Sequence, residues 1–233
     1  MLAVISGATK GIGRAVAIGF AEMGFDLALG ARNEENLENF KSYLEKTFPT
    51  IKILIKSLDF SRKEEILDFT RAIKKKFGSV DVIINNVGTF APGTISKEEE
   101  GQFENQMQTN LYSAYYLTRP FLEEMKNKKK GHIFNICSVV SKEVRKEAAS
   151  YSISKYALLG FSKVLAEEMR DYDVKVTAII PGAVNTPTWD GIDVPTEEFI
   201  QTSDIVDVII NAYQMSKNTY IEEISLKPLN KNY

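Results

Sequence analysis

A tyrosine and a lysine stand four residues apart in the stretch Tyr-Ser-Ile-Ser-Lys, from Tyr151 to Lys155. Residues with this spacing share one face of a helix, so the ammonium group can lie beside the phenol. A nearby cation stabilises the phenolate, and the hydroxyl then exchanges protons more readily near neutral pH. By itself, the pair is more typical of a solvated helix surface. An acid/base role requires partners from elsewhere in the chain.

A glycine-rich segment, Ser-Gly-Ala-Thr-Lys-Gly-Ile-Gly at 6–13, joins the first predicted strand to the first predicted helix. Gly7 permits a tight turn, Gly11 lets the backbone approach a pyrophosphate, and Gly13 lets helix and strand pack closely. The free N–H groups of the helix then face the phosphates. No Gly-Lys-Ser/Thr sequence follows, so this is not a Walker A loop. Its place in the first strand–helix unit favours a dinucleotide-binding loop over a plain turn.

Basic residues replace the acidic residue that an NAD site usually has at the end of the second strand. Ala31 takes that place, Arg32 follows it, and Lys10 lies in the glycine loop. Two cations without a carboxylate attract a 2′-phosphate, which arginine can bind with two parallel hydrogen bonds. The alternative is a pair of solvated basic residues. The sequence thus predicts NADP(H) as the cofactor.

Short apolar runs alternate with longer amphipathic runs along the whole chain. The predicted strands are 2–6, 26–31, 51–57, 81–86, 132–138, 175–180 and 220–226. The predicted helices are 12–23, 34–47, 62–77, 97–127, 150–171 and 204–215. Repeated strand–helix units predict an α/β doubly wound Rossmann fold, a seven-stranded parallel sheet with helices on both faces. With no linker or repeat, a single domain over 1–233 is predicted, and its ligands should collect at the carboxyl ends of the strands.

Several residues are expected to begin or end these helices. Ser61 and Ser96 are predicted N-caps, and Glu98 to Glu100 would fall in the first turn after Ser96. The glycines predicted to end helices are Gly24, Gly78 and Gly131.

The composition excludes several classes of protein. A net charge of -2 gives no electrostatic reason to expect nucleic acid or an anionic membrane as a partner. With one cysteine, Cys137, and one histidine, His132, neither a disulfide nor a metal site rich in these residues is expected. Both residues are predicted to be structural. No apolar run is long enough to span a membrane and the chain opens with a strand, so a cytoplasmic protein is predicted.

Three further motifs complete the pattern. Ser138 ends the fifth predicted strand, and Asn110 lies in the long fourth helix. Asn-Asn-Val-Gly (85–88) ends the fourth strand, and Pro-Gly-Ala-Val-Asn-Thr (181–186) follows the sixth. Together with the glycine loop and the Tyr–Lys pair, these motifs resemble the short-chain dehydrogenase/reductase family in its single-domain branch. The resemblance covers about four fifths of the chain, from the first strand to residue 186.

This resemblance implies an oxidoreductase that interconverts a carbonyl and an alcohol by hydride transfer. The residues that match the family's catalytic positions are Asn110, Ser138, Tyr151 and Lys155. Tyr151 would be the acid/base, Ser138 would hydrogen-bond the same substrate oxygen, and Lys155 would also hold the nicotinamide ribose. In the family, the asparagine supports a water that relays protons to the lysine. Two departures are mild, since Ser6 stands where threonine is usual and Val87 where alanine is usual.

The predicted cofactor contacts follow the same motifs. Asp59 and Phe60 are expected at the adenine, and Asn86 and Gly88 along the ribose. Val184 and Thr186 are expected near the carboxamide. The full predicted set is Gly7, Thr9, Lys10, Ile12, Gly13, Arg32, Asp59, Phe60, Asn86, Gly88, Tyr151, Lys155, Gly182, Val184 and Thr186.

Substrate choice is expected to lie in three variable segments, 89–96, 139–149 and 187–200. Trp189 in the last segment could lie over a substrate or simply pack the lid shut. The basic residues of the second segment could favour an anionic substrate, but interleaved glutamates favour a solvated loop; they are Lys142, Arg145 and Lys146.

The C-terminal sequence lacks the Val-Asp-Gly-Gly-like strand and tail of many tetrameric members of the family, ketoacyl-carrier-protein reductases included. That absence argues against both that substrate and that tetramer. Helices 97–127 and 150–171 instead predict a homo-oligomer, because the second of them is apolar on more than one face.

The predicted function is therefore an NADPH-dependent carbonyl reductase. One alternative is a nucleotide-binding regulator without turnover, which the four intact catalytic positions disfavour. The other is a Rossmann-like methyltransferase, which Arg32 and the Tyr–Lys pair disfavour.

Overall fold

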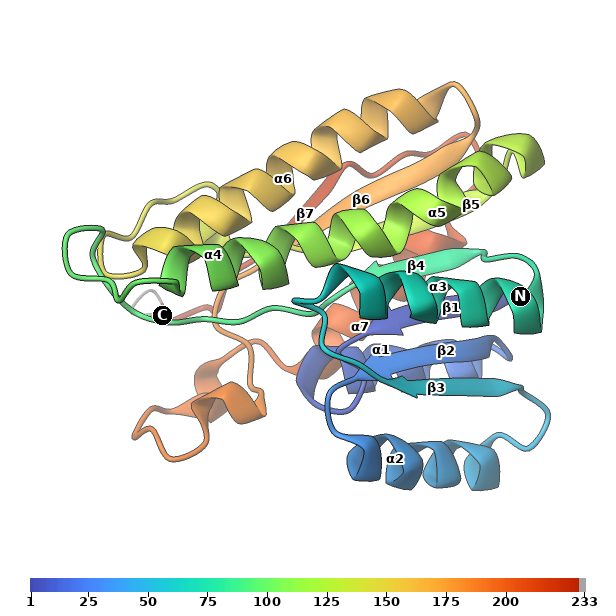
Figure 1. Ribbon diagram of the computed structural model, residues 1–233, viewed down its shortest axis with the longest axis horizontal. Coiled ribbons are helices and arrows are strands. Elements are labelled where there is room, and N and C mark those ends of the chain that lie inside the picture. Colours follow the sequence, from blue (N-terminus) through green and yellow to red (C-terminus); the bar gives the residue numbers. More distant parts are fainter. Residues whose placement is uncertain (231–233) are drawn as a thin grey trace.

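Seven short apolar segments form one parallel sheet in the computed structural model, which describes residues 1–230 (Figure 1). The strand order is β3-β2-β1-β4-β5-β6-β7. The strands are β1 (Leu2–Ser6), β2 (Asp26–Ala31), β3 (Ile53–Ser57), β4 (Val82–Asn85), β5 (Gly131–Ile136), β6 (Val174–Pro181) and β7 (Glu223–Leu226). The predicted Rossmann sheet is confirmed. The last three residues of the predicted 1–233 domain lie outside the described residues.

Helices cover both faces of the sheet, as predicted, and each face has its own apolar core (Figure 1). One core gathers side chains of α1, α2 and α7, and the other gathers those of α3, α5 and α6. The helices are α1 (Gly11–Glu22), α2 (Glu34–Thr47), α3 (Lys63–Phe77), α4 (Gln102–Met107), α5 (Ser113–Lys128), α6 (Ala149–Arg170) and α7 (Thr202–Gln214). Three 3-10 helices are η2 (Val139–Ser141), η3 (Pro187–Trp189) and η4 (Thr196–Glu198). Within residues 1–230, no helix is both long and apolar enough to cross a membrane.

The central strands are apolar because both of their faces are covered. All residues of β1 and of β4 are buried. Crossovers from β1 proceed outward through β2 to β3, and the chain then returns to place β4 on the other side of β1. The carboxyl ends of β1 and β4 therefore meet where the strand order reverses, which is where ligands bind in such sheets.

The prediction of one helix over 97–127 is wrong in two respects: the helix starts later, and it is interrupted. Helical structure begins at Gln102, after Gly101 in the left-handed region at φ 85°. A π-helical segment, η1 (Gln108–Tyr112), then separates α4 from α5. Ser96 is not an N-cap, because residues 94–98 form a separate turn in which the Thr94 carbonyl accepts hydrogen bonds from the two amides at its end.

Two other predicted helix boundaries are also wrong. The residue that precedes α3 is Arg62 rather than Ser61, whose amide instead donates to the Asp59 carboxylate at 2.9 Å. Gly131 begins β5 rather than ending a helix, because Lys129 takes the left-handed conformation that ends α5. The positions of Gly24 and Gly78 at helix ends, with φ of 76° and 77°, confirm the other two predictions.

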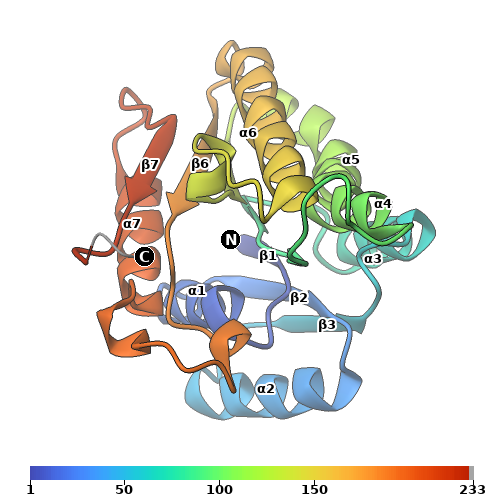
Figure 2. The same ribbon diagram turned by 90° about the vertical axis from the view of Figure 1, so that its left-hand side faces the viewer.

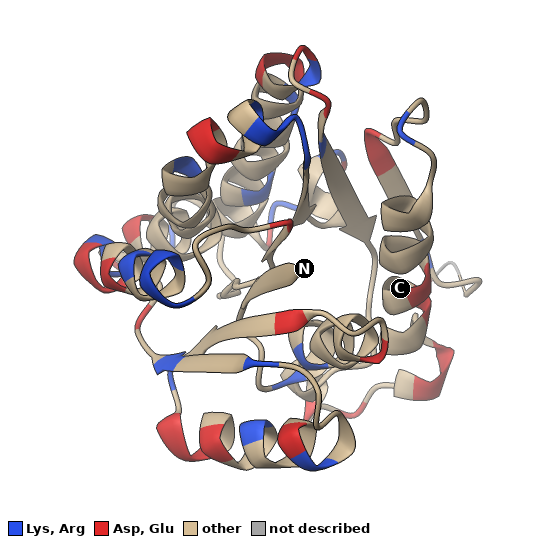
Figure 3. Ribbon diagram, turned by 90° about the vertical axis from the view of Figure 1, so that its right-hand side faces the viewer, with Lys and Arg blue, Asp and Glu red and all other residues tan. Residues whose placement is uncertain are grey.

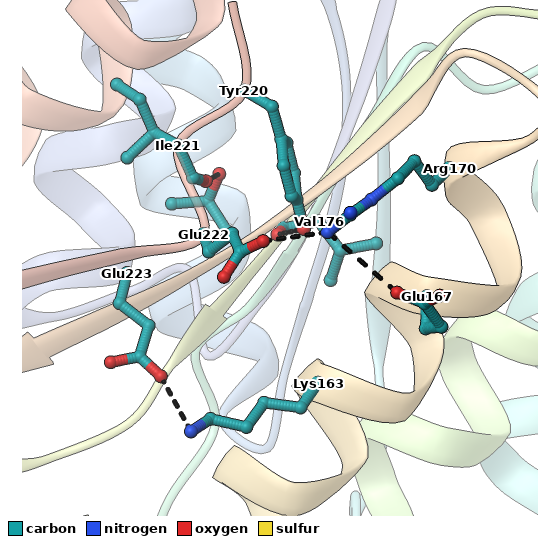
Figure 4. Close-up of polar contacts among 9 residues, drawn as sticks. Lys163, Glu167, Arg170, Val176, Tyr220, Ile221, Glu222 and Glu223 are labelled. Carbon is teal, nitrogen blue, oxygen red and sulfur yellow. Dashed lines mark hydrogen bonds and ion pairs between the residues drawn. The ribbon is translucent and has the colours of Figure 1, made fainter.

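Polar contacts join the edge strand β7 to helix α6 (Figure 4). Lys163 pairs with Glu223 at 3.1 Å, and Arg170 pairs with Glu222 at 2.7 Å. Just before the strand, the Tyr220 hydroxyl donates to the Val176 carbonyl at 2.8 Å. Exposed ion pairs of this kind contribute little stability each.

His132 is a buried structural residue at the start of β5, as predicted. Its Nε2 lies 2.8 Å from the Thr177 hydroxyl, which itself donates to the Ile221 carbonyl. The histidine therefore donates from Nε2 to Thr177. Its ring also stacks on Phe134, with ring centroids 3.9 Å apart. Burial, with a smaller effect from the Lys175 charge, lowers the pKa of His132 to about 3.

This burial predicts a loss of stability in mild acid. The unfolded chain binds a proton at His132 near pH 6.5, whereas the folded chain binds it only near pH 3. The free energy of unfolding therefore carries no penalty from His132 above about pH 6.5. Below that pH it falls by roughly 1.4 kcal/mol per pH unit. Urea unfolding from neutral pH to about pH 5 should show this slope in the wild type and lose it in His132→Gln. Equal slopes in the two proteins would contradict the assignment.

Candidate active site

The ends of β1 and β4 are joined by one hydroxyl and one amide. The Ser6 hydroxyl accepts from the backbone N–H groups of Asn86 and Val87 at 3.0 and 3.1 Å. The Asn86 side chain donates back to the carbonyls of Ser6 and Gly7 at 3.0 and 3.2 Å. Ser6 stands where the family usually has threonine, and its hydroxyl alone is enough to make these bonds. The first loop is thus fixed to the fourth strand.

The glycine loop is packed so closely that Gly13 has no room for a side chain and Gly7 and Gly11 have little. A Cβ on Gly13 would lie 2.3 Å from the Gly7 carbonyl oxygen and 2.5 Å from Nδ2 of Asn86. Gly7 has φ of 67° in the turn itself. A Cβ on Gly11 would lie 3.0 Å from the Thr186 side chain, which brings the 181–186 motif over the loop. Glycine at these positions therefore lets α1 and the 181–186 motif pack closely on the loop.

The residues around the loop suit a phosphate-bearing ligand. Helix α1 follows Lys10 with no side-chain cap and no acidic residue in its first turn, so its N–H groups stay available to an anion. Within the described residues, neither Lys10 nor Arg32 forms an ion pair with a carboxylate. Burial opposes ionisation of Asp59, but hydrogen bonds from Ser61 and the Arg32 charge hold its pKa below the usual value. Arg32 thus lies near enough to Asp59 for its charge to act on that carboxylate.

Other predicted cofactor residues surround the same edge of the sheet. Val184 is buried and forms a parallel bridge with Ile200, and Gly182 packs against Pro228. Phe60 is buried, and its ring packs on Gly30, because a Cβ on that glycine would lie only 2.8 Å from the ring. The Phe60 side chain therefore belongs to the core. Thr9 and Ile12 lie in the glycine loop and at the start of α1.

Lys155 is a buried cation beside Tyr151 on α6. Its side chain is 3% exposed, its Nζ donates to the Ile136 carbonyl at 2.8 Å, and it lies 5.8 Å from the Tyr151 ring centroid. Gly88 passes close over it, because a Cβ there would lie 3.4 Å from Nζ. A buried ammonium with one carbonyl partner keeps further donors for other groups.

Ser138 lies two residues beyond Ile136, past the end of β5 rather than in it. Its side chain caps the short helix η2 by accepting from the Val140 amide at 3.4 Å, and its own amide donates to Ser141 Oγ at 3.2 Å. The strand ends early because these caps replace the sheet pattern. The hydroxyl keeps its proton free to donate elsewhere.

Asn110 connects three parts of the site through its buried side chain. Its Oδ1 accepts from the Thr89 amide at 2.7 Å, and its Nδ2 donates to the Thr89 carbonyl at 3.0 Å and to Ser154 Oγ at 2.9 Å. Ser154 in turn donates to the Tyr151 carbonyl at 2.8 Å. Asn110 lies in the π-helical segment η1, so the change of helical period accompanies its inward position. The sequence analysis did not predict a role for Thr89 or Ser154. Their positions next to Gly88 and Lys155, two predicted site residues, could have indicated one.

The segments expected to select a substrate lie at this same edge of the sheet, which Figure 2 shows from the front. Trp189 donates from Nε1 to the Val184 carbonyl at 3.1 Å, and its ring packs on Phe199 with centroids 5.1 Å apart. These contacts favour the second interpretation, in which Trp189 packs the lid segment 187–200 shut and does not lie over a substrate. Lys142 pairs with Glu223 and Lys146 with Glu147, which favours a solvated loop over a site for an anionic substrate.

Cys137 does not face the site. It is buried beside Ala114 and Leu158, which confirms the predicted core position. Burial, opposed in part by the Lys155 charge, raises the pKa of the thiol to about 11, so it is a poor nucleophile. Among the described residues, no group of three or more His, Cys, Asp or Glu side chains could hold a metal ion.

Comparisons with known proteins agree with this geometry. The sequence model of the family described as short chain dehydrogenase matches residues 1–195. An uncharacterized oxidoreductase of Staphylococcus saprophyticus is 28% identical over 228 residues, which cover 98% of this chain and 97% of the relative.

Two solved structures extend the likeness. The alcohol dehydrogenase of the archaeon Thermococcus sibiricus, complexed with 5-hydroxy-NADP, is 27% identical with a TM-score of 0.91, over 99% of this chain and 97% of that one. A variant of actinorhodin polyketide ketoreductase with NADPH is 26% identical with a TM-score of 0.88, over 100% of this chain and 97% of that one. The chain therefore belongs to the short-chain dehydrogenase family of oxidoreductases.

Proposed function

We propose that this protein is an NADPH-dependent oxidoreductase that interconverts a ketone or aldehyde and the corresponding alcohol, with Tyr151 as the acid/base. The observation that carries this proposal is the buried Lys155 ammonium beside the Tyr151 ring, next to the glycine loop and its uncapped helix. The dehydrogenase structure with 5-hydroxy-NADP and the ketoreductase structure with NADPH support it by likeness.

Each side chain of the site has a task in this chemistry. Bound NADPH would supply the hydride, which leaves negative charge on the substrate oxygen. Tyr151 gives its proton to that oxygen, and the Ser138 hydroxyl donates a hydrogen bond to it. Lys155 stabilises the resulting phenolate and can also bind a ribose hydroxyl with a remaining N–H. In the direction of alcohol oxidation, Tyr151 is the base.

Asn110 has a structural task in this proposal. Its three side-chain hydrogen bonds hold Thr89 and Ser154, so its side chain keeps the loop after β4 against the helix that carries Tyr151. A role in supporting a water that reaches Lys155 would then belong to its backbone.

The residues present fit NADP(H). The close packing of Gly13 against Gly7, which keeps α1 tight on the loop, and the uncapped N-terminus of α1 suit the pyrophosphate. Lys10 and Arg32 would hold the 2′-phosphate, with Asp59 and the Phe60 backbone near the adenine. The Asn86, Gly88, Gly182, Val184 and Thr186 positions would follow the nucleotide toward the nicotinamide.

The acid/base assignment predicts that Tyr151→Phe keeps NADPH affinity and loses most turnover. Loss of a general acid typically costs about 10²–10⁴-fold in rate. NADPH oxidation should be followed with a panel of ketones, aldehydes, diketones and pterins. Tyr172→Phe, just past the end of the same helix, is the matched control and should turn over normally. Normal turnover by Tyr151→Phe would show that the proton donor is another group.

The same assay separates the proposal from its main alternative. A nucleotide-binding regulator would bind NADPH tightly and oxidise it with no member of the panel. Absence of NADPH binding would overturn both.

The cofactor assignment predicts that Lys10→Ala and Arg32→Ala each weaken NADPH binding and leave NADH binding nearly unchanged. A charge-assisted hydrogen bond contributes about 1.5–3 kcal/mol, so each change should raise the NADPH dissociation constant roughly tenfold to a hundredfold. Fluorescence titration of both nucleotides measures this. Lys41→Ala on α2, where the lysine pairs with Glu45, is the control. An unchanged ratio of the two affinities would contradict a 2′-phosphate site.

We also propose a homo-oligomer that buries the outer faces of the helices at 102–128 and 149–170. Large apolar side chains on them are at least 40% exposed, namely Phe103, Tyr112, Tyr115, Ile153, Tyr156 and Val164. Several exposed large apolar side chains on two neighbouring helices are typical of an interface. Val164→Asp, at a side chain 70% exposed on α6, should reduce the mass measured by light scattering. Val144→Asp, at a loop valine 75% exposed, should not. An unchanged mass for the first variant would place the contact elsewhere.

The remaining proposals concern the chain as a whole. We infer that residues 1–233 act as one cofactor-binding and catalytic domain in the cytoplasm, which a single cooperative unfolding transition and cell fractionation would test. Acidic and basic residues are interspersed on the face shown in Figure 3. This pattern gives that face no strong attraction for nucleic acid or an anionic membrane, in line with the small-molecule substrate proposed above.

A further inference from the structure

Helix α6 begins without the residues that usually stabilise the start of a helix. Its N-cap is Ala148, which has no side chain able to accept a hydrogen bond, and its first turn contains no acidic residue. The first residues are also shielded from water, since Ala148, Ala149 and Ser150 are 7%, 8% and 1% exposed. A buried helix end needs partners for its free N–H groups. For α6, they must come from another part of the chain.

The loop between β4 and α4 supplies these partners. The Gly93 carbonyl accepts from the Ala149 amide at 3.0 Å, and the Gly93 amide donates to the Glu147 carbonyl at 2.8 Å. Glu98 Oε1 accepts from the Ser150 amide at 2.9 Å, and Glu98 Oε2 accepts from the Ser150 hydroxyl. Glu98 thus provides, from 52 residues away in sequence, both the cap and the negative charge that α6 lacks.

Packing holds the Glu98 side chain in this place. A Cβ on Gly93 would lie 2.7 Å from Glu98 Cγ, so the carboxylate arm crosses directly over the glycine. Glu98 is partly buried, whereas its neighbours Glu99 and Glu100 are exposed. The sequence places all three in the first turn of a predicted helix, but only Glu98 faces a helix start, and that start belongs to α6.

Tyr151 follows Ser150 directly, so the capped turn carries the proposed proton donor. The same loop contacts the Tyr151 ring through Phe90, with ring centroids 5.2 Å apart at 84°. It is also fixed to Asn110 through Thr89. The loop therefore holds Ser150, the residue before Tyr151, through Glu98 and the Tyr151 ring through Phe90.

We propose that Glu98 is a positioning residue for Tyr151, and that its cap on α6 sets the place of the phenol relative to the substrate oxygen. This inference rests on the proposed function, because it assigns the effect to proton transfer. A misplacement of about 1 Å can cost on the order of 10²-fold in rate, so the cap should matter for kcat. Cofactor binding should change little, because the glycine loop and Arg32 are held by β1, β2 and β4, and Lys155 is held by the Ile136 carbonyl.

The test compares Glu98→Ala, Glu98→Gln and the control Glu99→Ala, each well below its melting temperature. In Glu98→Ala, kcat should fall at least about tenfold with an unchanged NADPH dissociation constant. Glutamine can still accept from the Ser150 amide and donate to its hydroxyl, so Glu98→Gln should stay within roughly threefold of the wild type. Glu99→Ala should match the wild type. Wild-type kcat in Glu98→Ala would overturn the proposal, as would equal losses in kcat and NADPH affinity.

Hydrogen exchange provides a second readout that does not depend on turnover. The amides of Ser150 and of the residues just after it should exchange faster in Glu98→Ala and remain protected in Glu98→Gln. Unchanged exchange in Glu98→Ala would overturn the cap. If the wild-type protein turns over no carbonyl at all, the proposed function fails, and the exchange rates still decide whether Glu98 fixes this turn.

Discussion

The reversal of strand order between β1 and β4 is the constraint on which the rest of the molecule depends. Parallel strands need crossovers of one hand, so the first three strands proceed away from β1 in one direction and the later ones in the other. Two strand ends are then left side by side with no crossover above them. Ser6 and Asn86 fasten these ends with hydrogen bonds of 3.0 to 3.2 Å. The glycine loop after β1 and the segment after β4, which are both proposed to bind the cofactor, are held together by this junction.

A buried polar network extends this junction to the catalytic helix. Asn85 donates to Thr118 on α5 and to Asn135 on β5, and Asn135 donates to Ser162 on α6. Satisfied polar groups in a core fix one arrangement of their elements, because a shift of any one leaves a partner unpaired. One atom of the network, Asn85 Oδ1, has no partner among the described residues. The network explains how the helix with Tyr151 and Lys155 is held in register with the strand that leads to Ser138.

The loop after β4 joins the two halves of the site on the other side. Its first residues are bound by Asn110, and its later residues bind the start of α6. Its contacts therefore link the region proposed for the cofactor to the region proposed for proton transfer. The C-terminal segment makes a comparable link farther out, since Lys227 pairs with Glu143 and Asn230 bonds to Glu198 in the lid. Substrate selection would then involve segments that are distant in sequence but tied by polar contacts.

The sequence by itself determined the sheet, its strand segments and the set of residues that meet at its carboxyl edge. It could do so because strand and helix periods, and glycine's freedom at close approaches, are local properties. Tertiary structure decided where helices begin when their caps are remote. Glu98 was expected at the start of its own helix and instead caps α6, because a side-chain oxygen can accept from any N–H group that folding brings near. The same holds for Asn110, Thr89 and Ser154, whose pairing depends on contacts between residues 21 and 44 positions apart.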